Sequence, residues 1–198
     1  MKKELIYRIF SRIPTIETER LILRGMRVSD KEDMYEYACL PTVTRFLTWE
    51  PHTSISYTKQ YLEYIGSRYR VGDFYDWAVV YKENGKMIGT CGFSRIDCRN
   101  DLGEVGYVLN PDYWGKGIAA EAVWAVMEFG FDKMNLHRIE ARFMKGNENS
   151  LKVMKKCGMQ YEGMGRENLF VKNRYVDVGV CSILQSEFKA VNIFRVGD

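Results

Sequence analysis

Alternating apolar and polar residues predict seven strands along the chain. Within residues 18–27, Leu21 and Leu23 share one face with Ile22 between them, the period-two pattern of a half-buried strand. Strand-like patterns recur in six further stretches: 74–81, 86–97, 104–109, 137–144, 161–171 and 175–184. The first two of these flank Asn84-Gly85, which between such runs is a strong hairpin signal.

Apolar residues at helical spacing predict four helices between these strands. Ser29 or Asp30 is suited to cap a short helix through Cys39, which should stop near Pro41. A second helix is expected over 56–71. The third, over 115–132, is apolar nearly all round, so we expect it to be buried against a sheet. The fourth opens at Asn147 or Asn149 and runs to Cys157, with Gly158 at its C-terminal cap.

The order of these elements predicts the fold class. A β-meander is followed by one strand–helix–strand crossover, a helix and a closing hairpin, which indicates an α/β (α+β) fold with a mixed sheet of about six to seven strands flanked by helices. At 198 residues the chain suits one domain. We expect that domain to span residues 16–187, between an N-terminal arm (1–15) and a C-terminal tail (188–198).

Composition narrows the possible partners. The formal net charge is +3 with acids and bases interspersed, which argues against nucleic acid and is compatible with an anionic small ligand. No apolar run approaches the roughly 18–20 residues of a membrane span, and residues 1–10 do not resemble a secretory signal. The five cysteines lack CxxC spacing and the chain has two histidines, so we expect reduced thiols, a cytoplasmic location and no metal.

One segment, GEVGYVLNPDYWGKGIAA at 103–120, points to chemistry. The strand leads through Asn110-Pro111-Asp112 into a loop with Gly115 and Gly117, and a long helix pattern begins at Ile118. Two glycines let the backbone pass close to a ligand. The free N–H groups and positive dipole end of the helix then favour an anion, most often a phosphate.

Several linked stretches together resemble the GCN5-related N-acetyltransferase (GNAT) superfamily, and within it the branch that is similar to ribosomal-protein N-terminal acetyltransferases. The resemblance covers about residues 16–184, and the order and spacing of the stretches carry it. They are ETERLILR (17–24), NGKMIGTCGF (84–93), EVGYVLNPDYWGKGIAAEAV (104–123), NLHRIEARFMKGNENSLKVMKKCGM (135–159), YEGMGRE (161–167) and YVDVGVCSIL (175–184).

Three positions depart from the superfamily pattern. Asp112 stands where the general loop has Gln or Arg, although a Pro-x-x-Trp-Gly version is usual in this branch. Met154 stands where other members have a tyrosine general acid, which moves attention to Ser150. Met159 replaces the usual aromatic after the helix-ending glycine, a packing change.

The resemblance implies acetyl-CoA as co-substrate and assigns residues to it. Backbone N–H groups of residues 115–120 would hold the pyrophosphate, Tyr107, Val108 and Leu109 would pair with the pantetheine arm, and an N–H near Leu109 would polarise the thioester carbonyl. Asn147 would contact coenzyme A. The complete implied cofactor set is Tyr107, Val108, Leu109, Trp114, Gly115, Lys116, Gly117, Ile118, Ala119, Ala120 and Asn147.

Two residues are candidates for catalysis. The resemblance implies that Ser150 hydrogen-bonds the sulfur, where a hydroxyl can protonate or stabilise the departing thiolate; the structural alternative is a helix cap. Glu104 is a candidate general base for the attacking amine, directly or through water, and the alternative is a solvated strand carboxylate. Glu140, on the adjacent strand, competes for the same role.

The sequence therefore predicts an acetyl-CoA-dependent N-acetyltransferase. The acetyl group would pass directly to a primary amine, either a protein N-terminus or a small molecule, in a ternary complex formed by a monomer or a homodimer. Two alternatives remain. Gly115-x-Gly117-x-x-Ala120 fits a relaxed dinucleotide fingerprint, which would suit an NAD-dependent oxidoreductase. A non-catalytic sensor of coenzyme A is the other.

Overall fold

The computed structural model describes residues 3–195, and residues 1–2 and 196–198, at the outer ends of the expected arm and tail, lie outside it. Eight strands form one mixed sheet in the order β1-β2-β3-β4-β5-β6-β8-β7. All neighbours are antiparallel except β5 and β6. The strands are β1 (Ile16–Glu17), β2 (Leu21–Arg24), β3 (Tyr75–Tyr81), β4 (Met87–Asp97), β5 (Leu102–Leu109), β6 (Arg138–Met144), β7 (Gln160–Val171) and β8 (Arg174–Leu184).

The predicted α/β class with a mixed sheet is confirmed, with one strand more than the six to seven expected. The difference lies at residues 16–24, where two short strands stand in place of one long one. The Thr18 hydroxyl accepts a hydrogen bond from the Leu21 N–H at 3.0 Å and closes a turn between them. A side chain that bonds the backbone locally in this way ends a strand.

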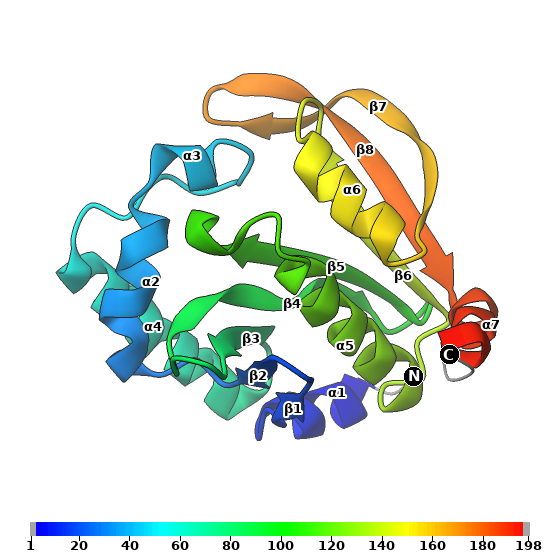
Figure 1. The fold of residues 1–198 in the computed structure, drawn as a ribbon, viewed down its shortest axis with the longest axis horizontal. Helices are drawn as coiled ribbons and strands as arrows, with labels where there is room; N and C mark the ends of the chain where they lie inside the picture. The colour runs from blue at the N-terminus through cyan, green and yellow to red at the C-terminus, as the bar shows by residue number, and fades with distance from the viewer. Residues whose placement is uncertain (1–2, 196–198) are drawn as a thin grey trace.

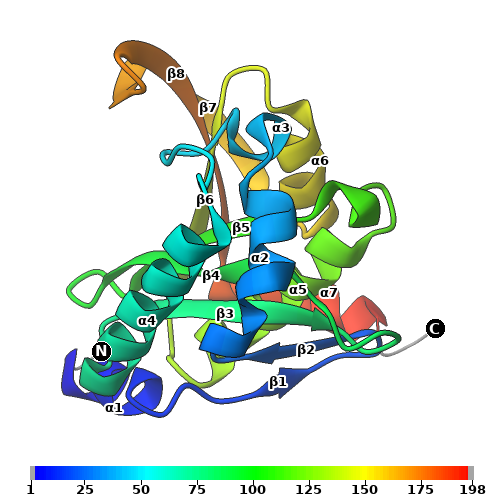
Figure 2. The ribbon, with the colours of Figure 1, turned by 90° about the vertical axis from the view of Figure 1, so that its left-hand side faces the viewer.

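Seven helices are described around the sheet (Figure 1), together with the short 3-10 turns η1 (Val28–Asp30) and η2 (Pro111–Tyr113). Helices α2 and α4 lie together on one face, as Figure 2 shows, and α5 packs on the other. No helix in residues 3–195 is long and apolar enough to cross a membrane. The helices are α1 (Lys3–Phe10), α2 (Lys31–Ala38), α3 (Pro41–Thr44), α4 (Ile55–Val71), α5 (Ile118–Asp132), α6 (Glu148–Lys156) and α7 (Gln185–Arg195).

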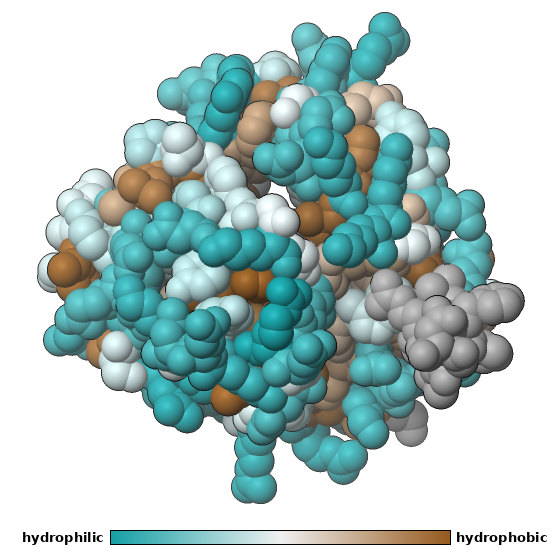
Figure 3. All heavy atoms as spheres, in the orientation of Figure 1, coloured by the Kyte–Doolittle hydropathy of each residue, from teal (hydrophilic) through white to brown (hydrophobic). Residues whose placement is uncertain are grey.

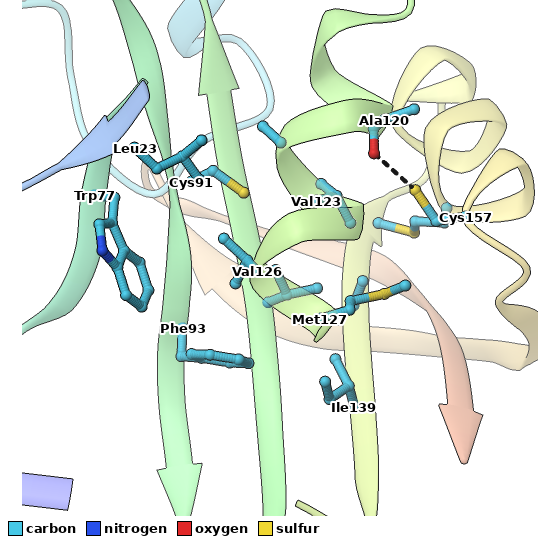
Figure 4. Packing of buried hydrophobic residues seen from close by; sticks show 14 of the residues in the cluster. Leu23, Trp77, Cys91, Phe93, Ala120, Val123, Val126, Met127, Ile139 and Cys157 are labelled. Carbon is cyan, nitrogen blue, oxygen red and sulfur yellow. Dashed lines mark hydrogen bonds between the residues drawn. The ribbon is translucent and has the colours of Figure 1, made fainter. Parts of the chain in front are cut away.

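Strand alternation divides the buried residues between the two faces. Trp77 and Val79 of β3 belong to the core shared with α5, whereas Ala78 and Val80 pack with α2 and α4. Helix α5 is buried along most of its length, as its all-round apolar pattern predicts. Figure 4 shows this larger core, in which the side chains of β2, β3 and β4 meet those of α5 and β6.

The helices at the two ends of the described chain also pack on the main core. Phe10 of α1 is fully buried and contacts Trp77 edge to face, with ring centroids 5.2 Å apart. Phe188 of α7 is buried against Trp124 and Phe131, at centroid distances of 4.5 and 5.0 Å. Aromatic pairs of this kind contribute about 0.5–1.5 kcal/mol beyond their buried area.

Candidate functional site

Strands β5 and β6 separate part-way along their length. They pair only where residues 102–104 meet residues 138–140. Between Val105 and Leu109 no described strand lies against this edge of β5, and Figure 1 shows the two strands diverging. The main-chain N–H and C=O groups on the open edge can therefore pair with an extended ligand, as a missing strand would.

A cavity of about 800 Å³ lies at this separation. Its walls come from β5, the loop after β5, the start of α5, the start of α6 and the segment 42–47. Figure 3 shows the corresponding face hollowed between polar and pale side chains, with apolar surface exposed within it. The lining residues are Thr42, Val43, Arg45, Phe46, Leu47, Tyr107, Val108, Leu109, Tyr113, Trp114, Gly115, Gly117, Ile118, Ala119, Ala120, Gly146, Asn147, Asn149, Ser150, Lys152, Val153 and Lys156.

The loop between β5 and α5 is built by its glycines and one tryptophan. Gly115 and Gly117 both have φ of 75°, in the left-handed region that glycine adopts without steric cost. The Trp114 indole N–H donates to the Leu109 carbonyl at 2.8 Å and ties the loop to the end of β5. Gly117 is the N-cap of α5 and supplies no side-chain cap, so the first N–H groups of the helix are left for a ligand.

Two cations lie beside Gly117. The nearest side-chain atoms to the position of a β-carbon there are Lys156 Nζ at 3.3 Å and an Arg20 nitrogen at 3.7 Å. Arg20 is balanced by Glu121 in the first turn of α5, at 2.6 Å, whereas Lys156 has no ion pair among residues 3–195. Lys152, one turn earlier on α6, lines the same cavity. The loop therefore combines helix N–H groups with unbalanced positive charge.

Helix α6 brings Ser150 to the cavity wall. Asn147 is the N-cap of this helix, because its side chain accepts a hydrogen bond from the Ser150 N–H at 3.3 Å. The Ser150 hydroxyl is left free of the capping role. It lies 2.8 Å from the Tyr107 phenol oxygen, and the phenol also donates to the Ser150 carbonyl at 3.0 Å.

The phenol of Tyr107 is a site feature that the sequence reading missed, because it used only the backbone of this residue. Alternation along β5 points Tyr107 toward α6, on the face of the sheet that holds the buried Val105. Burial raises the pKa of the phenol well above its ordinary value, against a smaller opposing effect of the Ser150 hydrogen bond. Met154, at the position of the tyrosine acid of other family members, is buried in the core.

Glu104 lies outside the cavity lining. Its carboxylate accepts from the Ser94 hydroxyl at 3.1 Å and faces Arg142 Nε at 3.3 Å and Arg95 Nε at 3.7 Å. Glu140 is paired with Arg138 at 3.0 Å in the same cluster. The roles of Glu104 and Glu140 as bases stay predictions.

The structure brings most of the predicted site residues to one cavity. Those that line it are Tyr107, Val108, Leu109, Trp114, Gly115, Gly117, Ile118, Ala119, Ala120, Asn147 and Ser150. Lys116 does not line it, although its carbonyl accepts from Arg20 at 2.9 Å and so helps to hold the loop. Within residues 3–195 no cluster of three or more His, Cys, Asp or Glu side chains is arranged to hold a metal ion.

The segment 42–47 forms another wall of the cavity and contacts residues next to β6, β7 and β8. Phe46 lies against Gly146, whose β-carbon position is 3.7 Å from the ring. From the turn between β7 and β8, the Lys172 ammonium donates to the Thr44 carbonyl at 2.8 Å and faces Glu50 at 3.6 Å. A segment far from the glycine loop in sequence thus forms the opposite side of the site.

The glycine loop follows an antiparallel meander. Only β5 and β6 are parallel, over three residue pairs, so the doubly wound parallel sheet of a dinucleotide-binding domain is not present in residues 3–195. The Gly115-x-Gly117-x-x-Ala120 spacing is therefore part of a different architecture.

Comparisons with known proteins agree with this architecture. Residues 20–160 match the acetyltransferase (GNAT) domain family. An uncharacterized N-acetyltransferase, p20, of Bacillus licheniformis is 36% identical over 88% of this chain and 98% of its own length. A GNAT-family acetyltransferase structure from Bacillus anthracis has a TM-score of 0.77 and 28% identity, covering 87% and 99% of the two chains. The ribosomal-protein-S5-alanine acetyltransferase of Vibrio fischeri has a TM-score of 0.70 and 29% identity, covering 88% and 98%.

Proposed function

The chain belongs to the GNAT acetyltransferase family and is an N-acetyltransferase, and from that premise we propose that it binds acetyl-CoA in the cavity and transfers the acetyl group directly to a primary amine. The observation that carries this proposal is the continuity of one cavity wall. The open edge of β5 leads without interruption into the glycine loop and the first turn of α5. An extended amide arm followed by phosphates matches that order of features.

The residues present fit coenzyme A. The N–H groups of residues 115–120 suit the pyrophosphate, and Lys152 and Lys156 add positive charge on the same side. The edge formed by Tyr107, Val108 and Leu109 suits the pantetheine amides. Trp114, tied to the Leu109 carbonyl, fixes the junction between these two parts.

Bound acetyl-CoA supplies a thioester whose carbonyl carbon is open to attack by an amine. A backbone N–H near Leu109 stabilises the developing negative charge on the carbonyl oxygen, worth ~3 kcal/mol in the transition state. Ser150 donates its hydroxyl proton toward the departing sulfur. Tyr107 positions Ser150 for this step, because its phenol contacts both the carbonyl and the hydroxyl of Ser150.

No acyl-enzyme is required. Cys157 and Cys181 are buried, and burial raises the pKa of the Cys181 thiol, which lowers its reactivity. The amine therefore attacks the thioester itself in a ternary complex.

The acceptor is a free amine that enters the cavity beside segment 42–47. The similar Vibrio fischeri protein bears the name of an acetyltransferase of ribosomal protein S5 alanine, which makes an N-terminal α-amine a natural first candidate. An α-amine has a pKa of about 7.7–8.0 and needs less help to deprotonate than a lysine at about 10.4. Small-molecule amines are the other class within this proposal.

A screen of amines with acetyl-CoA tests the proposal. Release of coenzyme A thiol and a mass increase of one acetyl group should both depend on the acceptor, which should include peptides with free N-termini and small diamines. If acetyl-CoA raises the melting temperature but no amine is turned over, the chain is a sensor of coenzyme A. If NADH binds and acetyl-CoA does not, the assignment of the cavity to acetyl-CoA is wrong.

A further inference from the structure

Asp76 is a half-buried residue that has no role in the site described so far. It lies on β3, on the face of the sheet that carries Ala78 and Val80 and packs against α2 and α4. Its Oδ1 is inaccessible to solvent and has no hydrogen-bond partner. A buried carboxylate oxygen without a donor is costly, so such an atom in a folded protein calls for an explanation.

Two glycines on neighbouring strands lie between Asp76 and the cavity. Asp76 pairs with Gly92 of β4, and Gly92 pairs with Gly106 of β5; these three residues form what we call the glycine row. Oδ1 of Asp76 lies 2.7 Å from the position of a β-carbon at Gly92, so the carboxylate leans along the row toward β5. Strands are about 4.8 Å apart, and the whole row therefore spans about 10 Å.

The far end of the row is open. At Gly106 a β-carbon would meet only the Ser94 β-carbon, at 4.0 Å. Gly106 directly precedes Tyr107, where the cavity wall begins, and Val108, on the same face as Gly106 by alternation, lines the cavity. The row thus leads from the predicted position of the thioester, beside the open edge of β5, to the carboxylate of Asp76.

The groups that face Asp76 carry no positive charge. They are the phenols of Tyr37 from α2 and of Tyr61 and Tyr69 from α4, and the Thr90 hydroxyl of β4. The Cys91 thiol of β4 is close but lies on the opposite face of the sheet. The Tyr37 hydroxyl, like Oδ1 of Asp76, is buried without a partner.

Burial raises the pKa of Asp76 to about 7, against smaller opposing effects of the Thr90 hydroxyl and the Trp77 N–H. Glu104, by contrast, already faces two guanidinium groups. Glu140, beside Glu104, is paired with Arg138, whereas Asp76 has a carboxylate oxygen without a hydrogen-bond partner.

We propose that the glycine row is the binding site of the acceptor's primary ammonium group and that Asp76 is the catalytic base that receives its proton. This rests on the proposed acetyl transfer and names the part of the site that the acceptor occupies. It also explains Gly106, because a side chain there would fill the space that the amine needs.

The proton and electron balance is simple. The ammonium gives one proton to a carboxylate oxygen of Asp76, and the nitrogen lone pair forms the C–N bond with the thioester carbon. The C–S bond breaks with its electron pair on sulfur, which takes a proton from Ser150, and the second nitrogen proton replaces the one that Ser150 gave. Asp76 then releases its proton to water, so the products are the acetamide, the thiol and one proton.

Two variants test the proposal, with the best acceptor of the wild-type protein. Asp76→Asn should lower kcat/KM ~10²-fold or more at pH 8 and leave the acetyl-CoA-induced rise in melting temperature unchanged. The wild-type kcat/KM should fall as the pH drops below about 7, with the pKa of Asp76, and the variant should lack that dependence. Asp132→Asn, the same change at an exposed position on α5, is the matched control and should keep wild-type kinetics.

Gly106→Val is the second variant, and it tests the acceptor site even if Asp76→Asn does not fold. Its φ is not in the left-handed region, so a β-branched residue is tolerated there. It should raise KM for the amine ~10-fold or more without weakening acetyl-CoA binding.

Normal turnover by a folded Asp76→Asn, or a loss confined to Glu104→Gln, would overturn the assignment of the base. An unchanged amine KM in Gly106→Val would overturn the acceptor site. Failure of the wild type to acetylate any amine would instead refute the proposed function.

Discussion

Replacing Asp76 by asparagine should stabilise the fold, and by an amount that grows with pH. Burial raises the pKa of this carboxyl from its ordinary value of 3.8 to about 7, so the folded state holds the proton more tightly than the unfolded chain does. The stability that protonation provides is complete below about pH 3.8 and is lost as the pH rises through about 7. Above that, the folded protein carries the cost of a charge whose Oδ1 is shielded from solvent and has no donor.

The magnitude follows from the same two values. A difference of about three pH units, at about 1.4 kcal/mol per unit, gives about 4 kcal/mol at pH 8 as an upper value. At pH 5 the pH is only about one unit above the pKa of Asp76 in the unfolded chain, so the cost to the folded state is about 1–2 kcal/mol. The gain on Asp76→Asn should therefore increase by about 2–3 kcal/mol between pH 5 and pH 8.

Urea unfolding at both pH values measures this directly. The free energy of unfolding is compared for the wild-type protein, Asp76→Asn and the exposed control Asp132→Asn, provided that the m-value is the same in all three. Any pH-independent effect of the amide cancels when the two gains are subtracted. A gain that does not grow with pH, or that the control shares, would mean that the carboxylate has a partner in solution. If the kinetic role of Asp76 is also correct, the variant will be more stable and less active.

Two further predictions concern the cavity. Gly117→Glu places a carboxylate among the N–H groups of the loop and strains a left-handed φ of 75°, so it should abolish the acetyl-CoA-induced rise in melting temperature; a folded variant with an unchanged rise would refute the loop assignment. Ser150→Ala should lower kcat ~10–10³-fold with little change in acetyl-CoA affinity, and because Asn147 caps the helix, little stability should be lost; Tyr107→Phe should show a smaller fall, and normal kcat in Ser150→Ala would end its catalytic assignment.

The sequence predicts the parts of the fold that local chemistry decides. The turn at Asn84-Gly85 separates β3 from β4, and α4 ends at Gly72 in the left-handed conformation, because these glycines carry their own backbone preference. The sequence predicts an N-terminal arm over residues 1–15, the region in which the structure has α1. Its Ile6 and Phe10, four residues apart, form the apolar face that packs into the core, but charged neighbours at this short length obscure the period.

The site divides in the same way. The strand, glycine loop and helix are adjacent in sequence, and the pattern predicts them as one unit. The contact between Tyr107 and Ser150 joins residues 43 positions apart, and it depends on which face of β5 meets α6. The shielding of Asp76 Oδ1 depends on the packing of two helices over one strand, and no spacing along the chain encodes the lack of a partner for that atom.

The position of β8 has a consequence for synthesis on the ribosome. Of the strands described in residues 3–195 it is the last to be made, yet it lies between β6 and β7, and β6 is held to β5 by only three residue pairs. The meander β1–β5 and helix α5 can assemble early, and α6 can pack on them through Met154 and Cys157. Strand β6, however, gains its long antiparallel partner only when residues 174–184 have been made, so this side of the cavity is completed late in synthesis. A premature stop before β8 would remove one whole side of the cavity rather than an outer edge of the sheet.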